Sequence, residues 1–469
     1  MIRSPDAHFG RGETLPGTGT GGGLMRLVLL GGGGFRVPLV HAGLLADPDR
    51  LVDELVLYDV SESRMHAIAA VLEAQAAGAS RRPRLRLTTD LDDALTGADV
   101  VFSAIRAGGL RGRELDERIA LKHGVLGQET VGAGGICYAL RTIPVAMRIA
   151  ERVAALAPDS WLINFTNPAG VVTAAMSAVL GDRVIGICDS PVGLCRRVAG
   201  ALGVPMAKAR FDYAGLNHLG WLRAVLVDGH DRLPGLLADE DALAGFEEGR
   251  LFGARWLRAL GAVPNEYLHY YYFTREVLAQ SLAQPDTRGQ FLHRQQAGFF
   301  ERVAGDPGEA LGLWQATRAE REQTYLAEGR AVAGSGERAD EDLAGGGYEE
   351  VALSLTAALA GVRDANLILN VRNRGAVPEL GRDTVVETHC QVDGNGPRPL
   401  AANPLDPHCL ALTRQVAAVE RSTVLAATTA SREQALLALA CHPLVDSVTC
   451  AAALLEDYLS AFPELGYLR

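Results

Sequence analysis

A run of four glycines, residues 31–34, directly follows a short apolar segment, residues 27–30. An apolar, helix-like segment comes next, and a second apolar run ends on Asp59. Glycine lets a backbone turn tightly and approach a pyrophosphate, and the N–H groups at a helix start favour its charge. An acid at the end of the second strand can accept hydrogen bonds from a ribose. The order predicts a nicotinamide dinucleotide site, although Arg36 occupies the third glycine position of the usual G-x-G-x-x-G pattern. The alternative is a tight turn without a ligand.

A cysteine and a histidine on separate predicted loops, Cys188 and His218, could together hold a divalent metal. One sulfur and one imidazole leave coordination positions open for the oxygens of a substrate. The residue types alone do not decide, because a lone buried cysteine usually serves packing and a histidine after an asparagine is often a cap. The pair is therefore a candidate metal site that depends on the elements which bring the two loops together.

Short apolar runs alternate with helix-like segments through the first 200 residues. Four of these runs are expected to be strands, at residues 84–88, 100–105, 161–165 and 184–187. Helices are expected at 92–95 and 143–157. Such alternation is typical of a parallel sheet, in which ligands lie beyond the carboxyl ends of the strands. The residues that follow those ends include Arg106, Asn167, Cys188 and Asp189.

The alternation stops after about residue 210. Helices are expected to dominate 250–330 and to return at 349–360 and 407–458, with strands at 367–371 and 384–392. We therefore predict an α/β fold with an NAD-binding Rossmann domain and a mixed α+β C-terminal domain, the architecture of lactate and malate dehydrogenases. The domains are predicted at 25–192 and 193–469, and the second would carry substrate, metal and subunit contacts. Residues 1–24, rich in Gly, Pro and Thr, are expected to form a flexible extension.

Composition limits the classes of partner. The formal charge of −11 argues against nucleic acid as the main partner. Residues 160–181 carry no charge, but Asn164, Asn167 and Pro168 interrupt them, so we do not expect a membrane span. Seven scattered cysteines, an odd number without a framework, favour a reducing compartment and hence the cytoplasm.

Nine short motifs occur in a fixed order along the chain. They are GGGGFRVP at 31–38, RAGGLRGR at 106–113, GQET at 127–130, NFTNP at 164–168, GICDSP at 186–191, GLNH at 215–218, PNEYLHYY at 264–271, LNVRN at 369–373 and HPLVD at 442–446. With these motifs the chain resembles glycoside hydrolase family 4, specifically its 6-phospho-glucosidase branch. The resemblance extends from residue 25 to about residue 457.

The resemblance implies an unusual hydrolase, which is an exception to the usual two-carboxylate scheme. In this family NAD+ takes a hydride from C3 of the sugar, and a divalent metal, usually Mn2+, polarises the resulting ketone. A tyrosine then removes the C2 proton, the aglycone leaves C1, water adds, and the hydride returns to C3. The substrate would be a phosphorylated disaccharide or an aryl glucoside, and the enzyme a homodimer or homotetramer.

The family's functional residues can be carried over through the matching motifs. Cys188 and His218 match the metal ligands, Tyr267 matches the base, and Asn167 matches a residue that binds sugar hydroxyls. Asn217, beside the metal histidine, is a further candidate for substrate binding. The nucleotide contacts are expected from Gly31, Gly32, Gly33, Gly34, Phe35, Asp59 and Glu129, the last with Thr130 in the loop between cofactor and sugar. Arg106 and Arg113 are our candidates for the 6-phosphate, because guanidinium groups bind phosphate bidentately.

The chain departs from the family pattern at several positions. Gly34 and Val37 stand where the family usually has Ser and Thr, and residues 344–348 carry no arginine where one is expected. Asp189 follows the metal cysteine, as is usual in α-glucosidases, whereas β-glucosidases usually have asparagine there. Asp189 could protonate the leaving group or support the metal ligand. Most of the chain is nearer the β branch, so we predict a 6-phospho-β-glucosidase, with the α-glucosidase as the alternative.

Two other classes compete with a glycosidase. A hydroxyacid dehydrogenase would share the architecture, but it would have a catalytic histidine beside an aspartate and no metal. A non-catalytic NAD-binding regulator would not need Cys188, His218 and Tyr267 intact. The Cys-Asp-Ser-Pro and Asn-His motifs argue against the dehydrogenase, and the intact Cys188, His218 and Tyr267 argue against the regulator.

Overall fold

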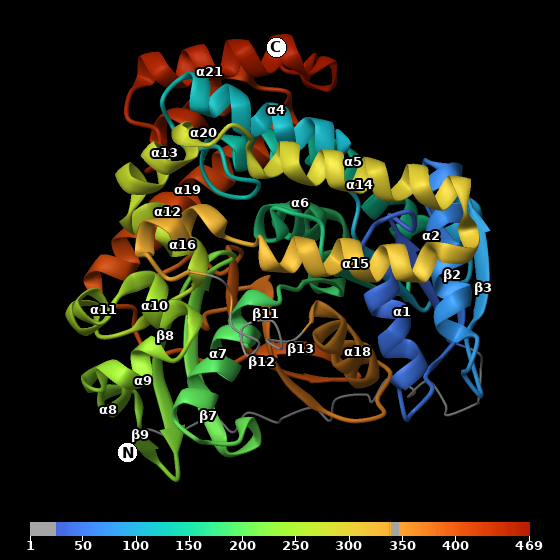
Figure 1. The fold of residues 1–469 in the computed structure, drawn as a ribbon, viewed down its shortest axis with the longest axis horizontal. Coiled ribbons are helices and arrows are strands. Elements are labelled where there is room, and N and C mark those ends of the chain that lie inside the picture. Colours follow the sequence, from blue (N-terminus) through green and yellow to red (C-terminus); the bar gives the residue numbers. More distant parts are fainter. Residues whose placement is uncertain (1–24, 337, 339–346) are drawn as a thin grey trace, which may run out of the picture.

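The computed structural model describes residues 25–336, 338 and 347–469. The predicted N-terminal extension, residues 1–24, and most of the glycine-rich stretch before Gly347 lie outside the described residues. Figure 1 shows the strands in the interior, with β2 and β3 at one side of the molecule and the β7–β9 region at the other. Helices from both halves of the chain cover the sheet between them.

The first half of the chain forms six parallel strands. They are β1 (Met25–Leu30), β2 (Val52–Tyr58), β3 (Arg84–Thr88), β4 (Val100–Ser103), β5 (Trp161–Asn164) and β6 (Val184–Gly186). Their order in the sheet is β3-β2-β1-β4-β5-β6, with every neighbouring pair parallel. This is the strand order of a Rossmann fold, and its topological switch lies between β1 and β4. The predicted fold class is therefore confirmed.

The sheet continues into the second half of the chain with antiparallel strands. Asn370 of β11 (Ala365–Arg372) pairs with Gly186 of β6. Beyond β11 lie β12 (Val385–Asp393), β7 (Ala209–Leu216), β8 (Leu219–Val227) and β10 (Val263–Pro264). Two short strands, β9 (His230–Asp231) and β13 (Gly396–Pro399), pair with β8 and β12. One mixed sheet thus crosses the predicted domain boundary at residue 192, which itself stays a prediction.

Helices surround this sheet. In the first half they are α1 (Val37–Ala46), α2 (Glu62–Ala76), α3 (Leu91–Leu95), α4 (Gly109–Lys122), α5 (Gly132–Leu156), α6 (Ala169–Leu180) and α7 (Ser190–Ala201). The middle of the chain has α8 (Leu233–Ala238), α9 (Glu240–Ala244), α10 (Glu247–Phe252), α11 (Ala254–Leu260), α12 (His269–Tyr272), α13 (Thr274–Ala283), α14 (Arg288–Gly305), α15 (Ala310–Gln323) and α16 (Ala327–Ala333). The last third has α18 (Tyr348–Leu359), α19 (Pro407–Thr429), α20 (Arg432–Cys441) and α21 (Val448–Ala461).

Most of the predicted elements are present, but α5 is much longer than the helix expected at 143–157. It begins at Gly132 and includes Gly134 and Gly135. A Cβ at Gly134 would lie 2.7 Å from the Gln128 carbonyl oxygen, and one at Gly135 would lie 2.5 Å from the Thr130 carbonyl carbon. These glycines are required because the loop before α5 lies directly against the helix, whereas in the sequence they look like helix breakers.

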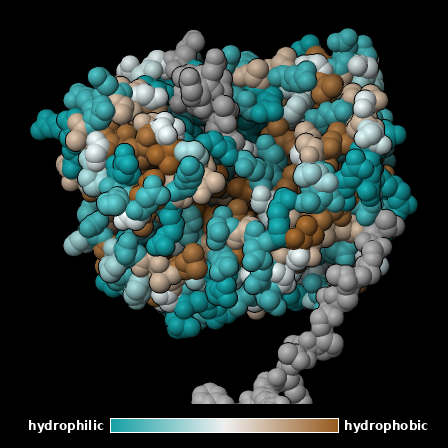
Figure 2. Space-filling model, turned by 90° about the horizontal axis from the view of Figure 1, so that it is seen from below, coloured by the Kyte–Doolittle hydropathy of each residue, from teal (hydrophilic) through white to brown (hydrophobic). Residues whose placement is uncertain are grey.

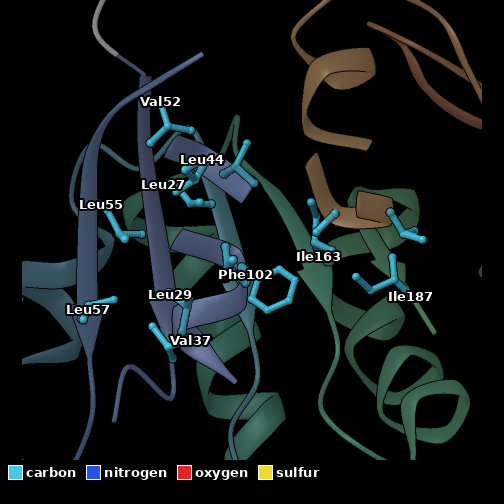
Figure 3. Close-up of a cluster of buried hydrophobic side chains, with 14 of the residues drawn as sticks. Leu27, Leu29, Val37, Leu44, Val52, Leu55, Leu57, Phe102, Ile163 and Ile187 are labelled. Atoms are coloured by element: carbon cyan, nitrogen blue, oxygen red, sulfur yellow. The ribbon is translucent and has the colours of Figure 1, made fainter. Parts of the chain in front are cut away.

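Alternating apolar residues of the parallel strands form the core of the first half of the chain. Leu27, Leu29, Leu55, Leu57 and Phe102 are buried side by side on one face of the sheet (Figure 3). Each fully buried side chain of this size contributes about 1.5–3 kcal/mol. The same cluster reaches residues of α14 and α15, which anchors these later helices to the first half of the chain.

The visible surface is mainly hydrophilic, and the cysteines form no disulfide among the described residues. In the view of Figure 2, hydrophilic side chains dominate and hydrophobic ones show between them. Within the described residues, no helix combines the length and apolarity that crossing a bilayer would require. All seven cysteines are free thiols.

Candidate active site

A cavity of about 1100 Å³ extends from the glycine loop to the tip of the β7–β8 hairpin. Gly31 and Asp59 line it near the carboxyl ends of β1 and β2. Cys188, His218 and Tyr267 line it on the side of the second half of the chain. The structure therefore gathers the predicted nucleotide and metal residues around one space, at the edge where α/β sheets bind ligands.

The glycine loop lies in close contact with the ends of the neighbouring strands. Gly31 has a positive φ of 89°, and a Cβ there would lie 2.6 Å from the Ala104 carbonyl oxygen. The Gly33 N–H donates to Asp59 Oδ2 over 2.8 Å, and the Ser61 N–H donates to Oδ1 over 2.9 Å. Asp59 is thus held rigidly against the loop, and each of its oxygens keeps a lone pair for a further donor.

Three of the predicted nucleotide residues have different surroundings. Gly34 lines the cavity with Gly31 and Gly33, whereas a Cβ at Gly32 would lie 2.6 Å from Leu57 Cβ. Gly32 thus allows the loop to lie on β2 and is not among the cavity-lining residues. Phe35 lines the cavity and is 5% exposed, and its carbonyl oxygen accepts a 2.8 Å hydrogen bond from Trp314 Nε1 of α15.

Cys188 and His218 lie side by side in the wall of the cavity. Cys188 lies between β6 and α7, and His218 occupies the two-residue turn between β7 and β8. Their Sγ and Nε2 atoms are 3.4 Å apart, and the two residues are 4% and 5% exposed. His218 has a positive φ of 61°, a conformation that costs a non-glycine residue about 1–3 kcal/mol and is concentrated at functional sites.

The hydrogen bonds behind His218 select its tautomer. The Thr130 N–H donates to Gln128 Oε1 over 2.7 Å, which identifies that atom as the acceptor of the side-chain amide. The Thr130 hydroxyl lies 3.1 Å from the same oxygen and donates to it. Thr130 Oγ1 is therefore left to accept from His218 Nδ1, 2.7 Å away. The proton on Nδ1 leaves the lone pair of Nε2 directed at Cys188.

This arrangement fits a divalent cation. Burial lowers the pKa of His218 to about 4, so the imidazole is neutral at pH 7. Burial, with the charges of Glu387 and Asp189 nearby, raises the pKa of the Cys188 thiol well above its usual range, so only a strong positive charge would hold the thiolate. No group of three or more His, Cys, Asp or Glu side chains suited to a metal occurs among the described residues. The pair would leave the remaining ligand positions to water or substrate oxygens.

Tyr267 lies directly on His218. The two rings stack with their centroids 3.7 Å apart and their planes inclined by 12°. Burial, followed by the charge of the neighbouring Glu266, raises the pKa of Tyr267 well above 10, and a hydrogen bond from Tyr325 acts in the opposite direction. Tyr267 is therefore a phenol at pH 7, and it could act as a base only beside an added positive charge.

Glu266 is an unusual carboxyl group beneath this tyrosine. It is 4% exposed, and burial raises its pKa to about 7. The Ser190 hydroxyl donates to its Oε1 over 2.7 Å. Its Oε2 has no hydrogen-bond partner among the described residues.

The two arginines predicted to bind phosphate both contact Glu129. Arg113 donates to Glu129 Oε2 over 2.7 Å and to Glu117 Oε1 over 2.8 Å, and Arg106 pairs with Glu129 Oε1. Burial would raise the pKa of Glu129, but the two guanidinium groups outweigh it and hold that pKa well below its usual range. Arg106 and Arg113 line the cavity, and most of their charge is balanced by protein carboxylates.

A second pair of arginines lines the cavity without such balance. Burial, with the charge of Arg113, lowers the pKa of Arg288 to about 10. Burial, with the charges of Arg36 and Arg288, lowers that of Arg321 to about 9. Arg288 donates to Thr324 Oγ1 over 2.6 Å and to the Arg321 carbonyl oxygen over 2.8 Å. No carboxylate of the described residues forms a salt bridge with either guanidinium group, so this wall is suited to an anion.

The remaining predicted residues separate into two groups. Asn167 and Asp189 line the cavity, and Asp189 Oδ2 lies 3.5 Å from a guanidinium nitrogen of Arg36. Asn217 is not among the cavity-lining residues, because its side-chain amide donates over 3.1 Å to the buried carboxylate of Glu387. The contact with Glu387 holds Asn217 in place directly before His218.

Sequence reasoning missed Glu266, Arg288, Arg321 and Tyr325 as members of the site. Glu266 could have been noticed, because it directly precedes Tyr267. The other three lie in the helical region 288–333, where no short motif distinguishes them from surface residues. Only the tertiary position of α14, α15 and the connection to α16 brings them to the cavity.

Comparison with known proteins gives a consistent relationship over nearly the whole chain. Residues 26–204 match the model "Family 4 glycosyl hydrolase", and residues 213–445 match "Family 4 glycosyl hydrolase C-terminal domain". A probable 6-phospho-beta-glucosidase of Bacillus subtilis is 32% identical over 449 residues, which cover 93% of this chain and 96% of that protein.

Two solved structures show the same fold at lower identity. The 6-phospho-beta glucosidase of Thermotoga maritima with manganese, NAD+ and glucose-6-phosphate has a TM-score of 0.78 and 27% identity, covering 94% of this chain and 99% of that one. A 6-phospho-alpha-glucosidase from gut microorganisms, in complex with NAD and Mn2+, has a TM-score of 0.75 and 25% identity, covering 94% and 98%. With both halves matched in sequence and the whole fold shared, this chain belongs to glycosyl hydrolase family 4.

Proposed function

We propose that this protein hydrolyses 6-phospho-glucosides with the help of NAD+ and a divalent metal, most simply Mn2+. The observation that carries the proposal is the meeting of Cys188, His218 and Tyr267 at one wall of a cavity whose other end is a dinucleotide-type glycine loop. Relatives that share this fold are phosphoglucosidases with NAD and Mn2+ in their structures, which supports the same cofactors here.

The nucleotide is proposed to bind along the glycine loop. The turn at Gly31 and the start of α1 offer N–H groups to a pyrophosphate, and Asp59 offers its free lone pairs to the adenosine ribose. Gly33, Gly34 and Phe35 would contact the nucleotide directly, and Gly32 would support the turn. The bound NAD+ supplies reversible hydride removal at C3 of the sugar, so that hydrolysis needs no net oxidant.

Cys188 Sγ and His218 Nε2 are proposed to hold the metal, which supplies Lewis acidity toward the oxygens at C2 and C3. Tyr267 lies against His218, within reach of the same region, and would remove the C2 proton that the neighbouring carbonyl makes acidic. Asn167 would bind sugar hydroxyls. Asp189 would protonate the leaving group or support Cys188.

The substrate's 6-phosphate is proposed to bind at the arginine-rich wall of the cavity. Arg106 and Arg113 remain candidates, with Glu129 holding both guanidinium groups in place between cofactor and sugar. Arg288 and Arg321 join them as candidates, since neither has a carboxylate partner among the described residues. Burial, with the charges of Arg36 and Arg288, lowers the pKa of Arg321, and a dianionic phosphate would relieve the repulsion among these cations.

A β-linked glucoside is the proposed substrate, and the α-linked one is the specific alternative. The β choice rests on the overall resemblance and on the Bacillus subtilis relative. The alternative rests on Asp189, because Asp-x-Pro at this position is typical of α-glucosidases. In this chain Asp189 lies beside Arg36, so its carboxylate has a charged neighbour on the cofactor loop.

The deciding experiment measures nitrophenol release from α- and β-linked nitrophenyl 6-phosphoglucosides, with and without NAD+ and Mn2+. We expect hydrolysis of the β-linked compound only when both additions are present, with no net NADH formed. Hydrolysis by protein freed of nucleotide and metal would refute the mechanism. Turnover of the α-linked compound alone would leave the mechanism intact and reverse the anomer.

Four further statements remain predictions. The protein is expected in the cytoplasm, as a homodimer or homotetramer, with no nucleic-acid or membrane partner. Its division into units at residue 192 is expected to separate nucleotide binding from substrate and metal binding. Cell fractionation would test the compartment, and sedimentation analysis would test the oligomeric state. Binding assays with nucleic acid and lipid vesicles would test the absence of such partners, and limited proteolysis would test the division at residue 192.

A further inference from the structure

The connection between α15 and α16 brings a second tyrosine to the proposed base. Tyr325 lines the cavity, and its hydroxyl oxygen lies 2.9 Å from that of Tyr267. It also lies 3.4 Å from Glu266 Oε1. A phenol has one proton to donate, and hydroxyl hydrogen bonds are strongest between 2.5 and 3.0 Å. The contact with Tyr267 is therefore the main one, and the contact with Glu266 is secondary.

The Tyr267 hydroxyl depends on this contact for its position. Stacking on His218 fixes the plane of the Tyr267 ring but gives the hydroxyl group no directional partner. Among the described residues, the hydroxyl of Tyr325 is the only hydrogen-bond partner of the Tyr267 hydroxyl. Without it, the oxygen that must meet the C2 proton would be held by ring packing alone.

Tyr325 is itself held from three sides. Arg330 donates to its backbone carbonyl oxygen, and the Arg338 guanidinium lies 5.2 Å from its ring centroid. Leu326 has a positive φ of 51°, which turns the chain sharply after Tyr325. Below it, the Ser190 hydroxyl donates to Glu266 and fixes this side chain. Ser190 is the first residue of α7, the helix that follows Cys188. A packed tyrosine with this many supports can set the position of another group.

We propose that Tyr325 is a positioning residue for the reaction, which holds the Tyr267 hydroxyl toward the C2–H bond of the sugar, and that Glu266 supports Tyr325 from below. The proposal rests on the proposed function, since it assumes that Tyr267 is the base. It also gives the α15–α16 connection a catalytic purpose.

The test compares the wild-type enzyme with Tyr325→Phe. This variant loses one hydroxyl and keeps the ring. We expect kcat on the β-linked 6-phosphoglucoside to fall about 10- to 100-fold, the scale of one hydrogen bond to a group that becomes charged, while KM and the Kd for NAD+ stay within about twofold. The kinetic isotope effect with substrate deuterated at C2 should rise, because proton removal becomes slower than the other steps. The effect with substrate deuterated at C3 should not rise.

Tyr271→Phe is the matched control. Tyr271 is four residues from the base, is absent from the cavity lining, and packs on His442 with ring centroids 6.0 Å apart. The Tyr271→Phe enzyme should have the wild-type kcat and both wild-type isotope effects. A purely structural role for Tyr325 would instead lower thermal stability and weaken NAD+ binding, without moving the C2 isotope effect.

Glu266→Gln provides a second variant in case Tyr325→Phe does not fold. It keeps the size of the side chain and an acceptor for Ser190, but removes the carboxylate, and we expect a smaller fall in kcat of about three- to tenfold with the same rise in the C2 isotope effect. A kcat within twofold of wild type in Tyr325→Phe, or an unchanged C2 isotope effect, would overturn the inference. A wild-type enzyme with no phosphoglucosidase activity would instead refute the proposed function on which it rests.

Discussion

The hydroxyl of Thr130 offers a direct test of how the proposed metal site is built. Thr130→Val replaces the hydroxyl by a methyl group of similar size. It removes the acceptor for His218 Nδ1–H, 2.7 Å away, and leaves Gln128 without one of its donors. His218 is 5% exposed, so water cannot easily replace the lost partner.

The expected magnitude follows from this burial. An unsatisfied buried N–H costs about 1–3 kcal/mol, which His218 would avoid by moving its proton to Nε2. That tautomer has no lone pair on Nε2, the nitrogen that faces Cys188, so metal binding must reverse the shift. We expect the Kd for Mn2+ to rise about 10- to 100-fold, the usual effect of losing such a partner behind a ligand, which corresponds to about 1.4–2.7 kcal/mol.

The assay titrates metal-free, NAD+-loaded protein with Mn2+ and follows the free ion by electron paramagnetic resonance. In parallel, the 15N shifts of labelled histidine report which ring nitrogen carries the proton. Thr428→Val is the control, because the Thr428 hydroxyl is exposed and, among the described residues, bonds only the Val424 and Leu425 carbonyls of its own helix. Equal Mn2+ affinity in Thr130→Val and wild type, or an Nδ1-protonated ring in both, would refute the reasoning.

Three other predictions test the proposed chemistry, the nucleotide contact and the pH dependence of folding. Reaction in D2O should place deuterium at C2 of the released glucose 6-phosphate, and Tyr267→Phe should lower turnover by about 10²–10⁴ without unfolding the protein; product with only hydrogen at C2 would contradict both. Asp59→Ala should weaken NAD+ binding by about 1–3 kcal/mol in a calorimetric titration, since the carboxylate also holds Gly33. The wild-type protein should bind NAD+ more tightly than NADP+, and equal affinities for the two nucleotides would argue against the ribose contact. Burial lowers the pKa of His442 to about 3 in the folded protein, whereas the pKa of this histidine in the unfolded chain is about 6.5. As the pH falls below about 6.5, the unfolded chain therefore binds a proton that the folded protein does not, and folding stability is lost. His442 should account for about 2 kcal/mol of the loss between pH 8 and pH 5 in urea unfolding, and an equally steep loss in His442→Gln would exclude it.

Local patterns predicted the parallel strands well because each buried strand is a short apolar run. The strand at 84–88 has the same limits in the structure, and the runs at 161 and 184 begin where predicted. The β7–β8 hairpin was not predicted, because its two-residue turn is Asn217-His218 and lacks the glycine that usually marks such turns. The strained φ of His218 replaces that glycine, and local propensity gives no sign of it.

The site was predicted only where chemistry and sequence motif coincide. Cys188, His218 and Tyr267 lie within matching motifs, and the structure brings all three together. Tyr325 was out of reach, because it lies 58 residues from Tyr267 in a helical region whose docking depends on packing. Pattern reasoning predicts the residues that the proposed chemistry demands, and tertiary packing decides which other residues lie beside them.

The charge of the cavity shows how an anionic substrate can bind to an acidic protein. The formal charge is −11, but exposed charges are screened beyond about 8 Å at physiological salt. Inside the cavity, Glu129 balances part of the charge of Arg106 and Arg113, and no described carboxylate pairs with Arg288 or Arg321. The local excess is therefore positive at this wall, whatever the sign of the whole surface. If a phosphate supplies the missing negative charge, Arg321→Gln should raise KM for the phosphorylated glucoside by at least tenfold and leave NAD+ affinity unchanged, and an unchanged KM would move the phosphate site elsewhere.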